Sequence, residues 1–200
     1  MTQLIDNIYF QKLSRQDPAE VCRRALCGYD AAARFYAVTA WGDDYAVYPH
    51  ECRIDRLTRK DPAPHDYFYL FVIYYLLNSR EIEISGEWIS EKDIPGGPTF
   101  FRGPHLIPTR LVSQTYRNDI ESFRNKCERL HGKPVKMADA AYRFEITARI
   151  PVSVLYWIGD DDFPPEAKIL FDRTITEHLP ADILFALAVA ICTRIGRSTA

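Results

Sequence analysis

The chain has 200 residues, of which 47% are hydrophobic and 26% are charged, a composition typical of one globular domain with a buried core. Its 25 basic and 27 acidic residues give a net charge of −2, which excludes the basic excess of a dedicated nucleic-acid binder. The longest apolar run, Tyr67 to Leu77, is too short for a membrane span of roughly 20 residues. The N-terminus lacks the apolar segment of a signal peptide, so we expect a soluble, cytoplasmic protein. We expect a single domain over residues 1–200, with the first 15 or so residues at its periphery.

The first predicted elements are a helix and a small antiparallel sheet. Asp17-Pro18 is typical of a helix N-terminus, and Gly28 is expected to end this helix. Apolar and aromatic residues at 34–40 and 45–48 flank a polar turn and predict a β-hairpin. A third strand is predicted over residues 51–57.

The middle of the chain combines a strongly apolar segment with an irregular one. Residues 65–78 are apolar on every side, and the length of this run favours a buried helix over a strand. Residues 81–84 alternate as a short strand would. The segment 95–108 contains four prolines and three glycines, yet it also carries aromatic and cationic side chains that argue against disorder. Long connections of this kind are often functional.

A helix is predicted over residues 114–131, with Gly132 beyond its end. Its apolar stripe is formed by Tyr116, Ile120, Phe123, Cys127 and Leu130. Residues 142–150 alternate like a strand with one solvent-facing side. Pro151 separates this strand from the next, residues 152–158, and either a tight hairpin or a bend or bulge at Pro151 fits the sequence.

The last predicted helix begins at Pro180 and ends before Gly196. Residues 183–191 within it are apolar throughout, so this helix is either central or paired with another chain. Strands that follow one another as hairpins, without βαβ alternation, predict an α+β fold with a mostly antiparallel sheet and helices packed on it.

An acidic turn is predicted between the strand at 152–158 and a further strand at 167–171. Gly159 ends the first strand, and Asp160, Asp161 and Asp162 follow it. Three adjacent carboxylates offer oxygen ligands for Mg²⁺ or Ca²⁺. A solvated turn is the alternative, and it is the usual fate of a short charge run. Phe163, the next residue, is expected to be buried.

Five cysteines are scattered along the chain, and this odd number without a CxxC pair fits neither a disulfide framework nor a zinc module. Cys22 and Cys27 would point in different directions on one helix. We therefore expect reduced, structural cysteines and no tightly held metal or cofactor. The five are Cys22, Cys27, Cys52, Cys127 and Cys192.

Four segments form a recognisable pattern: Trp88-Ile89-Ser90, Pro95-Gly96-Gly97, Phe100-Phe101, and Gly159 to Pro164 together with Leu170-Phe171-Asp172. With this pattern the chain resembles, over residues 15–195, the bacterial and archaeal family catalogued as domain of unknown function 3786. Some relatives are joined to an iron–sulfur module, which implies a role beside iron–sulfur or corrinoid redox proteins. This chain lacks the four clustered cysteines that a cluster needs, so any cluster would belong to a partner. The resemblance carries no established activity.

The first hypothesis for the function is a binding or accessory module. Its site would be formed by Trp88, Phe101, Arg102 and His105 around an anionic or planar ligand, because arginine recognises carboxylates and phosphates with two parallel hydrogen bonds. If the acidic turn adjoined this loop, Asp160–Asp162 would complete a polar cleft. The alternative is that Arg102 is an ordinary surface charge.

Two further hypotheses come from other parts of the chain. A metal-dependent hydrolase could use Asp160–Asp162 with His105 or His178, since a bound metal ion activates water. No HExxH, G-x-S-x-G or P-loop motif supports an enzyme, so the sequence leaves catalysis undecided. A structural or oligomerising domain is the third hypothesis, with homo-oligomers formed through the apolar C-terminal helix.

Overall fold

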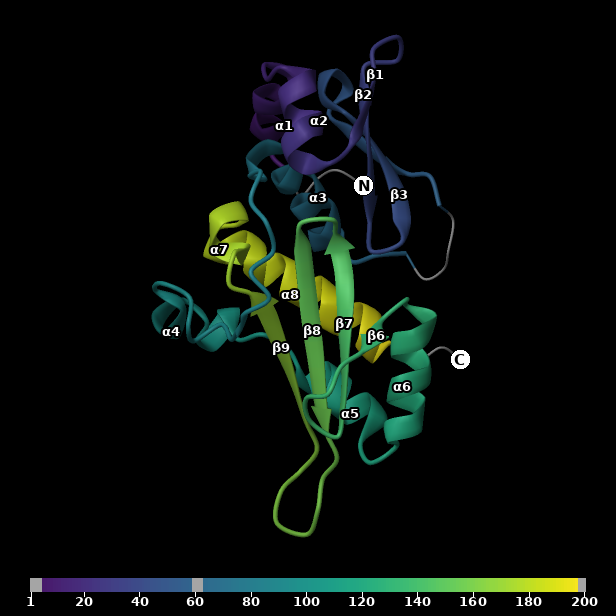
Figure 1. The fold of residues 1–200 in the computed structure, drawn as a ribbon, viewed down its shortest axis with the longest axis vertical. Helices are drawn as coiled ribbons and strands as arrows, with labels where there is room; N and C mark the ends of the chain where they lie inside the picture. The colour runs from purple at the N-terminus through teal and green to yellow at the C-terminus, as the bar shows by residue number, and fades with distance from the viewer. Residues whose placement is uncertain (1–4, 59–62, 198–200) are drawn as a thin grey trace.

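The computed structural model describes residues 5–58 and 63–197, and it has the α+β fold that the sequence predicts. Two antiparallel sheets follow one another along the chain, and helices pack on both (Figure 1). No helix in these described segments is long and apolar enough to cross a membrane.

The first sheet has the strand order β1-β2-β3-β4. The pairing of Ala40 with Asp43 leaves Trp41 and Gly42 as a two-residue turn, with φ angles of 48° and 74°. Positive φ at both central residues is the property of a type I′ turn, which matches the twist of the flanking strands. The predicted hairpin and third strand are confirmed. The strands are β1 (Gly28–Asp30), β2 (Phe35–Ala40), β3 (Asp43–Tyr48) and β4 (Arg53–Arg56).

Two short helices, α1 (Asn7–Ser14) and α2 (Pro18–Ala25), lie beside this sheet. α1 packs against α3, and its Phe10 and Leu13 are fully buried, so α1 belongs to the core and is not peripheral. The prediction that Gly28 ends α2 is wrong. Leu26 takes the left-handed conformation after Ala25, and Gly28 already pairs in β1.

Helices α3 (Asp66–Asn78) and α8 (Ala181–Gly196) pack against each other, and α8 passes behind β7 and β8 in Figure 1. The predicted buried helix at 65–78 is confirmed. The sequence left open whether this helix is central or paired with another chain. α8 is central, because α3 and α5 cover it within this chain. Its apolar composition is therefore explained without a second chain, and a homo-oligomer stays a prediction.

The second sheet has the strand order β5-β9-β8-β7-β6. Strands β7 and β8 form a tight hairpin with only Ala148 and Arg149 between them, and a bulge lies between Glu145 and Thr147. Of the two alternatives, the tight hairpin is therefore confirmed. The bend or bulge at Pro151 is wrong, because Pro151 pairs with Glu145 within β8 and the bulge lies opposite it in β7. The strands are β5 (Trp88–Ile89), β6 (Lys133–Pro134), β7 (Ala140–Thr147), β8 (Ile150–Trp157) and β9 (Glu166–Asp172).

The predicted helix at 114–131 is two helices, α5 (Arg110–Tyr116) and α6 (Ile120–Arg129). The chain breaks at Arg117, where φ is 50°, and the Asp119 carboxylate then caps α6 by accepting a hydrogen bond from the Ser122 amide. Phe123 and Cys127 are fully buried and Tyr116 is buried, as predicted, whereas Ile120 and Leu130 are only half-buried.

Residues 79–110 cross from the first sheet to the second. The strand predicted at 81–84 is absent, because this segment bonds to side chains instead of a neighbouring strand; Arg149, for example, donates to the Ile82 carbonyl. The predicted irregular segment 95–108 contains two short helical turns, α4 (Gly97–Phe100) and the 3₁₀ turn Gly103–His105. The remaining short helix, α7 (Ile175–His178), follows β9.

Candidate functional site

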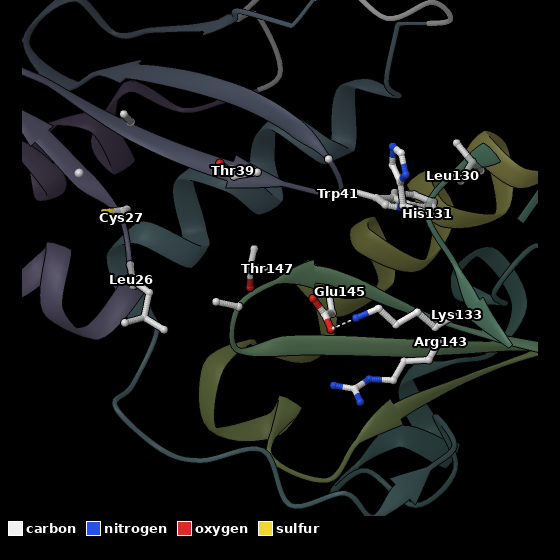
Figure 2. Close-up of a pocket in the computed structure, with 15 residues that line it drawn as sticks. Leu26, Cys27, Thr39, Trp41, Leu130, His131, Lys133, Arg143, Glu145 and Thr147 are labelled. Atoms are coloured by element: carbon white, nitrogen blue, oxygen red, sulfur yellow. Dashed lines mark hydrogen bonds and ion pairs between the residues drawn. The ribbon is translucent and has the colours of Figure 1, made fainter. Parts of the chain in front are cut away.

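A cavity of about 590 Å³ lies where the two sheets meet. Trp41 joins the sheets, since its amide donates a hydrogen bond to the Ile146 carbonyl at 2.7 Å. We call this cavity the inter-sheet groove, and Figure 2 shows its lining side chains. Six of the residues that line the groove are Leu26, Trp41, His131, Lys133, Arg143 and Glu145.

The floor of the inter-sheet groove is the polar side of β7. The two-residue period of a strand places Arg143 and Glu145 on the same side. Lys133 of β6 pairs in register with Arg143, and its Nζ lies 3.0 Å from Glu145 Oε1. Both partners of this ion pair are more than half exposed, so it is worth only about 0–1 kcal/mol and separates easily.

Arg143 is the unusual residue of this floor. Its Nε is buried and finds no hydrogen-bond acceptor among the described residues. A buried donor without an acceptor destabilises a structure by about 1–3 kcal/mol. Arg143 also lines the groove, so its positive charge favours an anionic ligand there.

One end of the groove is formed by the β2–β3 turn and the residues after α6. His131, with a φ of 62°, packs over Gly42: a methyl group added to Gly42 would lie 3.2 Å from the His131 ring. Gly42 therefore combines a positive φ with a close approach that a larger residue would disturb. Trp41 Nε1 is a second buried donor that finds no acceptor in the described part of the chain.

A buried ion network holds this turn in place. The fully buried Asp43 carboxylate lies 3.2 Å from Arg56 and 3.0 Å from Arg194. Arg194 also lies over the Trp41 ring and donates to the Trp41 carbonyl at 3.3 Å. Burial lowers the pKa of Arg194, and the Asp43 carboxylate opposes this shift. The network ties α8 to the turn that carries Trp41.

The opposite end of the groove is formed by the residues that follow α2. Leu26 is exposed in its left-handed conformation, and Cys27 comes next. The reversal of the chain at Leu26 brings Cys27 Sγ to 3.9 Å from Cys22 Sγ. The expectation that these two cysteines point apart is therefore wrong, because α2 ends between them.

The loop residues predicted as a site lie elsewhere, near the end of β9. Trp88 pairs with Asp172 and is half-buried, while Phe101 is buried. His105 stacks on Phe100 with ring centroids 4.5 Å apart, which makes it part of an aromatic cluster. Arg102 is exposed. Their role in binding stays a prediction.

The predicted acidic turn connects β8 and β9. The Asp160 carboxylate accepts hydrogen bonds from the amides of Asp162 and Phe163, at 2.9 and 2.7 Å, and all three aspartates are exposed. Phe163 is 71% exposed, so the prediction that it is buried is wrong. The Asp160 carboxylate closes the turn, and the Phe163 ring stays outside the core.

The joint cleft between the acidic turn and the 95–108 loop is not formed. β5 pairs with the Asp172 end of β9, whereas Asp160–Asp162 precede its Glu166 end. Figure 1 shows the β8–β9 turn at the foot of the molecule, with α4 and α7 beside the other end of β9. His178 of α7 is therefore also remote from the aspartates. Among residues 5–58 and 63–197, no three His, Cys, Asp or Glu side chains are grouped to hold a metal ion.

His178 is instead a buried structural residue. Its Nδ1 accepts a hydrogen bond from the Arg80 amide at 3.1 Å. Burial, assisted by the positive charges of Arg149 and Arg80 and opposed by Glu177 and Asp172, lowers its pKa to about 4. His178 is therefore neutral at pH 7 and fixes the start of the 79–110 segment.

This buried histidine predicts a loss of stability in mild acid. The folded-state pKa lies below the unfolded value of about 6.5, so the contribution is complete above pH 6.5 and disappears as the pH falls to about 4. The expected loss is about 3 kcal/mol over this window. Urea unfolding at several pH values measures it. His178→Asn should remove this part of the pH dependence, and the exposed His50→Asn should leave it unchanged; equal slopes in both variants would contradict the assignment.

Comparison with known proteins supports the pattern noted in the sequence. The family described as Domain of unknown function (DUF3786) matches residues 17–194. Neither the curated proteins nor the solved structures contain a match to this chain. The comparisons therefore give a family and no activity.

Proposed function

Because the chain belongs to the DUF3786 family, whose description names no activity, we propose from the inter-sheet groove that the protein is a binding module for a small anionic ligand. The ligand carries a carboxylate or phosphate on an apolar or planar body. The observation that carries this proposal is Arg143, which lines the groove and whose buried Nε finds no acceptor among the residues that the structure describes.

The charges of the groove favour an anion. Arg143, Lys133 and His131 supply hydrogen-bond donors, and Glu145 is the one acidic side chain that lines the groove among the described residues. An anion that enters the groove can replace Glu145 as the partner of Lys133, because their ion pair is exposed and weak. Arg143 can then bind the same group with two parallel hydrogen bonds, the geometry that suits carboxylates and phosphates.

The size and walls of the groove suit a small molecule. Its volume of about 590 Å³ lies within the range of roughly 300–1,000 Å³ that small-molecule sites occupy. Leu26 and Leu130 add apolar surface at its two ends. The body of the ligand would lie between these ends while its anionic group contacts Arg143.

The proposal is tested by thermal unfolding with inorganic phosphate, adenosine monophosphate and benzoate as separate probes. A probe present at a hundredfold excess over its dissociation constant stabilises the fold by about 2.7 kcal/mol, a rise in Tm of about 5–10 °C. Arg143→Gln should weaken binding by about 10–100-fold, because a hydrogen bond to a charged group is worth about 1.5–3 kcal/mol.

The matched control is Arg102→Gln, which removes one exposed arginine from the 95–108 loop. It should bind the probe as the unsubstituted protein does. If Arg102→Gln loses binding and Arg143→Gln retains it, the site is the loop and not the groove. If none of the probes raises Tm, the anion-binding proposal fails.

The role beside an iron–sulfur or corrinoid protein, implied by the family resemblance, stays a separate proposal. The described cysteines offer no group of three or more ligands for a cluster, so the cluster would be the partner's. Co-purification with such a protein, tested with Arg143→Gln and Arg102→Gln, would show which surface the partner uses.

A further inference from the structure

Two of the five cysteines lie close together beside the inter-sheet groove, and one of them, Cys27, lines it. Cys22 is in the last turns of α2, and Cys27 is the second residue after its end. Their Sγ atoms are 3.9 Å apart. We propose that Cys22 and Cys27 form a redox-active dithiol that oxidises to an intrachain disulfide at the groove.

The local backbone brings the two thiols together. Leu26 has a φ of 50° and a ψ of 51°, and this left-handed residue reverses the chain at the end of α2. The Cys27 amide then donates to the Cys22 carbonyl at 3.2 Å, which fixes the two residues relative to each other. A disulfide requires an S–S distance of about 2.04 Å, so the sulfur atoms must approach by about 2 Å for the bond to form.

The two thiols are also accessible. Cys22 and Cys27 are half-buried, whereas Cys127 and Cys192 are buried. Cys22 is half-buried, so a small oxidant can reach it, and Cys27 lines the groove next to it. Cys52 is also half-buried, and it serves as a matched single thiol for the test.

The chemistry is a thiol–disulfide exchange with a low-molecular-weight disulfide such as glutathione disulfide as the oxidant. Burial raises the pKa of the Cys27 thiol to about 12, with the neighbouring Cys22 thiol adding to the shift, so Cys27 is protonated at neutral pH. In the first step Cys22 Sγ bonds to one sulfur of glutathione disulfide, the Cys22 proton passes to solvent, and one glutathione thiolate leaves. Cys27 loses its proton to solvent, attacks Cys22 Sγ and displaces the second glutathione. In total, two protein thiols and one glutathione disulfide give one protein disulfide and two glutathione thiols. Two electrons pass from the protein to glutathione disulfide.

Oxidation changes the wall of the groove, because Cys27 lies directly after Leu26 and before β1. The disulfide would hold these residues against the end of α2. This inference concerns the thiols alone and does not depend on the ligand proposed for the groove.

The test is a thiol count and disulfide mapping by mass spectrometry after equilibration in glutathione buffers. The unsubstituted protein should lose two of its five thiols and two hydrogens in mass, with the bond mapped to Cys22 and Cys27. Cys27→Ser should stop at a glutathione adduct on Cys22, and Cys22→Ser should form no intrachain disulfide. Cys52→Ser should behave as the unsubstituted protein does. Five thiols retained in oxidised buffer, or a bond that involves Cys52, would overturn the proposal.

Discussion

Replacing Asp43 by Asn is expected to destabilise the fold by about 3–5 kcal/mol, because it removes a buried carboxylate that pairs with two largely buried arginines. Asp43 is fully buried, and the Arg56 and Arg194 side chains are only 10% and 12% exposed. Water therefore cannot replace the lost carboxylate. Chemical denaturation should show the loss directly, and thermal unfolding should show a fall in Tm of about 6–20 °C.

The control for this prediction is Asp55→Asn in the same sheet. Asp55 pairs with Arg53, and both side chains are more than a third exposed. An exposed pair contributes only about 0–1 kcal/mol, so this variant should remain close to the unsubstituted protein. If the two variants lost equal stability, the buried network would not be what holds the Trp41–Gly42 turn.

Phe123→Ala is the second large effect, with an expected loss of about 3–5 kcal/mol. Phe123 is fully buried on α6 and stacks on Tyr156 of β8, with ring centroids 4.6 Å apart. Tyr116 and Tyr142 also contact its ring edge-on. Removing the ring leaves a cavity between α6 and the second sheet, which equilibrium unfolding in urea would measure.

Phe163→Ala is the matched control, since it deletes the same ring from a position that is 71% exposed. Exposed substitutions of this kind change stability by less than about 0.5 kcal/mol. A large loss in Phe163→Ala, or a small loss in Phe123→Ala, would show that the packing of α6 is not as described.

Local patterns predict those parts of the fold that local rules control. The hairpin β2–β3, the buried helix α3 and the alternating strand β7 follow from hydrophobic period and turn residues. The break between α5 and α6 does not, because a distant residue supports it: the Tyr156 hydroxyl donates to the Arg117 carbonyl at 2.6 Å. The end of α2 was likewise misplaced, because Leu26 occupies a conformation that glycine usually takes.

The inter-sheet groove could not be predicted, because its residues come from separate segments that look ordinary one by one. Arg143 and Glu145 appear in the sequence only as the polar side of a strand, and Trp41 only as part of a turn. What joins them is the Trp41–Ile146 hydrogen bond between two sheets, which no local signal encodes. The composition of the 95–108 loop predicts a binding site, yet its aromatic residues pack inward and its Arg102 faces solvent.

The measurement that tests the groove most directly is a map of backbone amide shifts by heteronuclear NMR, recorded with and without the anionic probe that raises Tm most. Anion binding in the groove should produce the largest changes at Gly42, His131, Lys133 and Arg143, and Arg143→Gln should abolish them. Changes centred on residues 95–108, or on the acidic turn at 158–165, with Gly42 and Arg143 unaffected, would contradict it.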